Sequence, residues 1–104
     1  MNYILLFFFF FLVSCNDSKK VDVSQFKPKL DGKEIFSQRC VACHGSNGKL
    51  GFSGAKDLTV SKFTVPQIIN QVTNGKGAMT PFKNILTTDE IMEVANYCKT
   101  LQIK

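Results

Sequence analysis

Cys40, Cys43 and His44 form the group of residues with the most specific chemical pattern in the sequence, the run Cys-Val-Ala-Cys-His. The spacing C-x-x-C-H is the attachment pattern of c-type haem. Two thiols three residues apart reach the two vinyl groups of one porphyrin and form thioether bonds, and the imidazole that follows offers a nitrogen to the iron. The pattern therefore predicts one covalent haem c, with His44 as an axial ligand.

Three other kinds of site use similar residues. A thioredoxin-like redox pair requires a βαβ setting, and no stretch of this sequence alternates like a strand. A zinc site that adds Cys98 to the group is conceivable, but zinc sites usually space their ligand pairs apart. A disulfide between Cys40 and Cys43 would leave His44 and the loop after it unexplained. The haem site is favoured over all three.

Few residues of this chain could supply the second axial ligand. The chain has one His and three Met, so two His ligands from this chain are excluded. Met92 falls inside a predicted helix, where a packing or surface role is expected. Met79 lies in a Gly-rich segment, where glycine permits close approach to a flat ligand. We expect Met79 to bind the iron opposite His44, which raises the reduction potential, leaves no vacancy for substrate and favours electron transfer over catalysis.

Helical signals surround these residues, and they indicate three main helices. Asp31 and Glu34 have the spacing of a capping box before a helix at roughly 32–42. A second helix is expected from near Thr64 to Gly75, and a third is capped at 87–90 and runs to Leu101. Between the first two helices lies a Gly-rich loop, residues 45–63, whose length is unusual in a small domain unless it is functional.

The N-terminus has a different character from the rest of the chain. Ten consecutive apolar residues, Ile4 to Val13, are too few to span a membrane but suit the core of a signal peptide. The following Leu-Val-Ser-Cys, ending at Cys15, resembles the bacterial lipoprotein box, in which the Cys is lipidated. We expect residues 1–14 to be a signal peptide, 15–30 a lipidated flexible tether and 31–104 the folded domain. Plain secretion with a free thiol at Cys15 and a buried N-terminal helix are the alternatives.

Composition limits the function further. The chain has 104 residues with a formal net charge of +5, and every charged side chain follows Ser14. This length allows one small domain and excludes a multidomain enzyme. Lys49, Lys76 and Lys83 could steer docking onto an acidic partner, or they could simply solubilise the protein. Basic and aromatic residues do not interleave on one face, so no nucleic-acid partner is expected. Cys98 is expected to be a packed thiol in a monomer, and a disulfide-linked dimer is the alternative.

From Asp31 to Gln102 the sequence resembles the class I cytochromes c, especially the short monohaem forms of bacteria and photosynthetic organisms. Gly32, Phe36 and Tyr97 match positions where the first helix of that family crosses the last, and the segment 74–79 looks like its Met loop. Two features depart from the family pattern. Thr80 separates Met79 from the proline, and residues 54–58 contain no proline whose carbonyl could accept the His44 N–H.

The resemblance implies an all-α cytochrome c fold, with three main helices and Gly-rich loops wrapped around one haem. It implies an electron carrier, rather than an enzyme, that works between extracytoplasmic redox partners. With the lipoprotein signal, we expect the carrier to be tethered to the membrane on the periplasmic side. Two alternatives remain: a haem-based sensor in which Met79 is displaced by a diatomic gas, and an electron-entry subunit of a larger oxidoreductase.

Overall fold

The structure, a computed structural model, describes residues 30–103 and consists of helices joined by loops. The expected signal peptide, Cys15 and nearly all of the expected tether lie outside the described residues. In chain order the elements are α1 (Gly32–Arg39), α2 (Val41–His44), the 3₁₀ turn η2 (Phe52–Gly54), α3 (Val65–Asn74) and α4 (Thr88–Leu101). Over residues 30–103 there is no strand, apart from one isolated bridge between Lys76 and Met79. The predicted all-α fold is confirmed.

The helix boundaries follow the capping signals in the sequence. Asp31 accepts a hydrogen bond from the Glu34 N–H at 2.8 Å and begins α1. Gln67 accepts from the Thr64 N–H at the start of α3, and Glu90 accepts from the Thr87 N–H at the start of α4, both at 2.8 Å. The second and third predicted helices are therefore confirmed.

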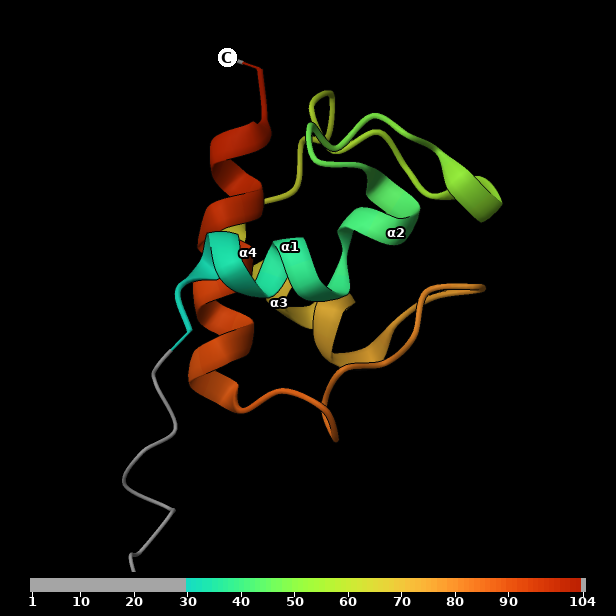
Figure 1. The fold of residues 1–104 in the computed structure, drawn as a ribbon. Coiled ribbons are helices and arrows are strands. Elements are labelled where there is room, and N and C mark those ends of the chain that lie inside the picture. Colours follow the sequence, from blue (N-terminus) through green and yellow to red (C-terminus); the bar gives the residue numbers. More distant parts are fainter. Residues whose placement is uncertain (1–29, 104) are drawn as a thin grey trace, which may run out of the picture.

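The first predicted helix is wrong in its extent, because the continuous helix ends at Arg39. Cys40 interrupts the regular helix with φ of −118° and ψ of −29°, although its N–H still bonds to the Phe36 carbonyl at 2.9 Å. The separate short helix α2 then carries Cys43 and His44. The break at Cys40 directs α2 away from the axis of α1 (Figure 1). The apolar and capping pattern over 32–42 does not reveal this change of direction.

Helices α1 and α4 cross with almost no space between their backbones. A Cβ atom at Gly32 would overlap the Glu93 carbonyl oxygen and would lie 2.9 Å from Tyr97 Cβ. One turn further along α1, the Phe36 ring packs against the Tyr97 ring with centroids 5.2 Å apart and planes at 55°. The predicted contact of Gly32 and Phe36 with the last helix is confirmed.

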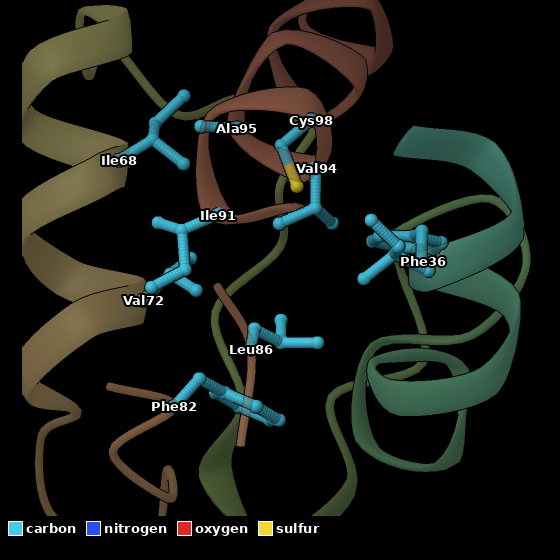
Figure 2. Close-up of a cluster of buried hydrophobic side chains, with 10 residues drawn as sticks. Phe36, Ile68, Val72, Phe82, Leu86, Ile91, Val94, Ala95 and Cys98 are labelled. Atoms are coloured by element: carbon cyan, nitrogen blue, oxygen red, sulfur yellow. The ribbon is translucent and has the colours of Figure 1, made fainter. Parts of the chain in front are cut away.

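A single apolar core lies where three helices meet. Figure 2 shows Val94, Ala95 and Cys98 of α4 between the side chains of α3 and Phe36 of α1. Ile35 and Val94 are completely buried. Leu30, the last residue of the expected tether, also packs against this core.

Cys98 is buried in the core, as expected for a packed thiol. Burial, and then the nearby Cys40 thiol, raise the pKa of Cys98 to about 12. Cys98 thus stays an uncharged apolar group in neutral solution. Within the described range 30–103, the helices are too short or too polar for any of them to cross a bilayer.

The crossing predicts that Gly32→Ala lowers the free energy of unfolding by about 2–3 kcal/mol, because the added methyl group has no room beside α4. Denaturant unfolding followed by circular dichroism would measure this loss. Ser37→Ala, at an exposed position of the same helix, is the matched control and should change stability by less than about 0.5 kcal/mol. Equal stability of the two variants would contradict a close-packed crossing.

Candidate functional site

Of the sequence-predicted ligands, Cys40 lies at the junction of α1 and α2, Cys43 and His44 lie in α2, and Met79 lies in the loop after α3. The loop after α2 and the loop after α3 both project to the same side of the helices, and α2 lies between them (Figure 1). The first loop, 45–64, contains η2, and the second, 75–81, contains Met79. Its base is closed by the Phe82 N–H, which bonds to the Val72 carbonyl of α3 at 3.0 Å.

His44 is held by a hydrogen bond that defines which ring nitrogen is free. Its Nδ1 lies 3.0 Å from the carbonyl oxygen of Lys56, twelve residues along the chain. A carbonyl only accepts, so Nδ1 must carry the proton and donate it. In this tautomer Nε2 has a lone pair for a metal, which is the usual arrangement of a metal-binding His.

The cysteines of the described chain are all free thiols, and their exposure differs. Cys43 is exposed, Cys40 is half-buried and Cys98 is buried. Burial, together with the neighbouring Cys43, raises the pKa of Cys40 to about 11. Between Leu30 and Ile103 no three His, Cys, Asp or Glu side chains converge as a metal site would require. The described residues therefore give no support to the zinc alternative or to a Cys40–Cys43 disulfide.

Met79 and Met92 lie in different surroundings. Met92 is on the outer face of α4 with 45% of its surface exposed. Met79 is half-buried against the core, and its sulfur lies 3.8 Å from the Gln71 side-chain nitrogen, which donates to it. A thioether sulfur has two lone pairs, so a bond from Gln71 leaves one available. Met79 is thus both positioned and able to act as a ligand, as its loop position predicts.

The backbone of the Met79 loop depends on one glycine. Lys76 and Met79 exchange two backbone hydrogen bonds, of 3.2 and 3.0 Å, which close a tight turn. Gly75 enters this turn with φ of +64°, and a Cβ atom there would overlap the Met79 carbonyl oxygen and lie 2.8 Å from Pro81 N. Gly77 also has positive φ, of +57°, but a Cβ atom there would meet nothing within 4 Å. Of these two glycines, Gly75 therefore combines positive φ with a close approach, and Gly77 does not.

A shallow hollow of about 430 Å³ runs along α3. It is lined by Phe63, Pro66, Gln67, Asn70 and Gln71. Gln71 lines this hollow and also donates to the Met79 sulfur. A free Nε2, two unpaired thiols and an available thioether sulfur are together a donor set that fits haem c.

Sequence reasoning missed two groups of this site. It assigned no partner to the His44 N–H, because residues 54–58 contain no proline. The acceptor is instead the backbone carbonyl of Lys56, a group that every residue type supplies. It also treated Gln71 only as part of a helix. A polar residue on the half-buried side of α3, one turn before the Met loop, is the signal that could have indicated it.

Comparisons with known proteins agree on one family. A family model described as "Cytochrome C oxidase, cbb3-type, subunit III" matches residues 28–98. Cytochrome c6 of Leptolyngbya boryana is 46% identical over 72 residues, which cover 64% of this chain and 84% of that protein. Cytochrome c6 of Gracilaria tenuistipitata var. liui is 37% identical over 98 residues, or 88% and 90% of the two chains. The crystal structure of cytochrome c6 from the diatom Phaeodactylum tricornutum superposes with a TM-score of 0.58 at 34% identity, over 66% of this chain and 87% of that one.

Proposed function

Because this chain belongs to the c-type cytochromes, with cytochrome c6 among its relatives, we propose that it carries single electrons at a haem held by Cys40, Cys43, His44 and Met79. The chain is a monohaem electron carrier and not an enzyme, and its cofactor is one haem c. The same relationship indicates that it exchanges electrons with redox partners and that it works outside the cytoplasm. The observation that best supports the ligand set is the His44 tautomer, which leaves Nε2 for iron.

Each proposed ligand has a separate task. Cys40 and Cys43 would hold the haem by thioether bonds, so that it is not lost outside the cytoplasm. His44, held by the Lys56 carbonyl, and Met79, held by Gln71, would bind the iron. The haem supplies a one-electron ferric–ferrous couple. With His44 and Met79 both bound to it, the iron would have no open position for a substrate, which would suit a carrier rather than a catalyst.

The Met79 ligand is tested by a matched pair of glycine variants. Gly75→Ala should displace the Met79 loop, abolish the sulfur-to-iron charge-transfer band of the ferric protein and allow the ferrous protein to bind CO. Gly77→Ala, also at positive φ but in open space, should keep the band and exclude CO. Absorption spectra of the two holoproteins make this comparison. A wild-type protein that lacks the band, or that binds CO readily, would exclude Met79 ligation and favour the sensor.

The partner surface is proposed to be acidic, because charges are unevenly distributed over the described residues. From Gly45 to Lys83 there are five exposed Lys side chains, Lys49, Lys56, Lys62, Lys76 and Lys83, and one acidic residue, Asp57. The other acidic residues of 30–103 lie at the start of α1 and in the first half of α4. The segment from Gly45 to Lys83, which contains the two loops beside α2, is therefore basic, and it would steer a negatively charged partner toward the site.

Charge reversal near the site tests this docking surface. Lys76→Glu should slow oxidation of the ferrous protein by ferricyanide about three- to tenfold at low ionic strength, and it should speed oxidation by a cationic cobalt complex. Lys33→Glu makes the same change of net charge on α1 and should have a much smaller effect. Stopped-flow kinetics at several salt concentrations would measure both. Equal effects of the two variants would show that only net charge matters.

The membrane tether rests on the sequence of the N-terminus. We propose that residues 1–14 are removed and that Cys15 is lipidated, with 15–30 as the tether of a monomeric domain. Metabolic labelling with palmitate should mark the wild-type protein, and Cys15→Ser should be unlabelled and recovered in the soluble fraction. Cys98→Ser is the matched control and should remain labelled. A mature N-terminus other than Cys15, or processing that is insensitive to globomycin, would contradict lipidation.

A further inference from the structure

The carbonyl that holds His44 belongs to the peptide group between Lys56 and Asp57. The orientation of this peptide group is set by the backbone dihedral angles on its two sides, those of Lys56 and Asp57. The Lys56 side chain is exposed, so it does not by itself fix the carbonyl. The residues that follow Lys56 must therefore account for the position of its oxygen.

Asp57 closes a tight turn immediately after this carbonyl. Its Oδ1 accepts a hydrogen bond from the Thr59 N–H at 2.8 Å and a second from the Thr59 hydroxyl at 2.6 Å. Such a turn restricts the backbone angles of the Asp, because the side chain takes the place of a backbone acceptor. The pKa of Asp57 is lowered, first by the hydrogen bond from the Thr59 hydroxyl and then by the one from the Thr59 N–H. The positive charge of Lys49 lowers it further. The acceptor is thus a charged carboxylate in neutral solution, which makes both bonds stronger than neutral ones.

The turn is itself bonded to other parts of the protein. The Leu58 N–H bonds to the Gly48 carbonyl at 2.9 Å, near the start of the same loop. The Ile103 N–H, just beyond α4, bonds to the Thr59 carbonyl at 2.7 Å. Thr59 is 6% exposed and is one of two buried polar residues in the described chain. The turn therefore has a fixed position relative to α4 as well as to α2.

We propose that Asp57 is a positioning residue for His44: its turn with Thr59 fixes the Lys56 carbonyl and so sets the strength of the bond from His44 Nδ1. This inference rests on the proposed ligation of iron by His44. A stronger hydrogen bond at Nδ1 makes the imidazole a better electron donor and favours ferric iron. Loosening the turn weakens the bond, so the reduction potential rises.

The experiment uses the holoprotein and two substitutions of one residue. Asp57→Ala removes both the turn and the charge, whereas Asp57→Asn removes the charge and keeps an oxygen for Thr59. Exchange of the His44 Nδ1 proton with D₂O, followed by NMR in the ferrous protein, should be about tenfold faster in Asp57→Ala, which corresponds to one lost hydrogen bond. Asp57→Asn should retain most of the wild-type protection, and its reduction potential should rise less than that of Asp57→Ala.

Asp31→Ala is the matched control, because Asp31 also accepts a backbone hydrogen bond but does so at the far end of α1. It should lower the free energy of unfolding and leave the Nδ1 exchange and the potential unchanged. Wild-type exchange in Asp57→Ala would overturn the proposal. Equal changes in Asp57→Ala and Asp57→Asn would also overturn it, since the effect would then be one of charge.

A third variant keeps the proposal testable if Asp57→Ala does not accumulate. Thr59→Val removes one of the two bonds to Asp57 without changing any charge, and it should give a smaller increase of both exchange and potential. No increase in either quantity would contradict a positioning role. A failure of the proposed ligation would look different, because the wild-type protein itself would lack the spectrum of a His- and Met-ligated haem.

Discussion

The close crossing of α1 and α4 at Gly32 is the contact on which the rest of the structure depends. The two helices are far apart in sequence, and a backbone without a side chain lets them meet. The Phe36 and Tyr97 rings then pack at a tilt beside the crossing, and α3 packs on the other side of α4. Because α2 follows α1 after a single non-helical residue, the crossing also determines where Cys43 and His44 lie.

The buried apolar core involves the helices, and it leaves large apolar side chains of the first loop exposed. The described residues bury ten hydrophobic side chains, and these lie at the junction of the helices and not between the two loops. Four large hydrophobic side chains of the first loop remain exposed, namely Leu50, Phe52, Val60 and Phe63. A bound porphyrin is a large apolar group, so haem c would contribute to the fold as well as to electron transfer. Covalent attachment makes that contribution permanent.

The two proposed iron ligands, His44 and Met79, are positioned in different ways. Met79 depends on a short loop that begins at Gly75, whose turn is closed by backbone bonds between Lys76 and Met79 and whose base is closed at Phe82. His44 depends on a contact between a helix and a carbonyl twelve residues away. That carbonyl is in turn oriented by side-chain bonds within the first loop and by a contact from the end of α4. The long Gly-rich loop is therefore part of the site, and it does more than connect two helices.

The sequence alone determined the helices, because capping residues and apolar spacing are local properties. Thr87 with Glu90, and Thr64 with Gln67, mark helix starts that the structure confirms. The C-x-x-C-H spacing likewise indicates haem by itself, since its chemistry needs only neighbours in the chain. Local patterns did not reveal the break at Cys40, which changes the direction of the backbone within one residue.

Only the tertiary structure decided what surrounds the ligands. The acceptor for His44 is a backbone carbonyl. Every residue has one, so no residue type in the sequence could indicate Lys56. The contact of Gln71 with Met79 needs α3 and the next loop to be folded against each other. The bonds that lead from Asp57 through Thr59 to Ile103 join residues that are brought together by the loop's return to α4. Such contacts depend on distances in space, which spacing along the chain does not contain.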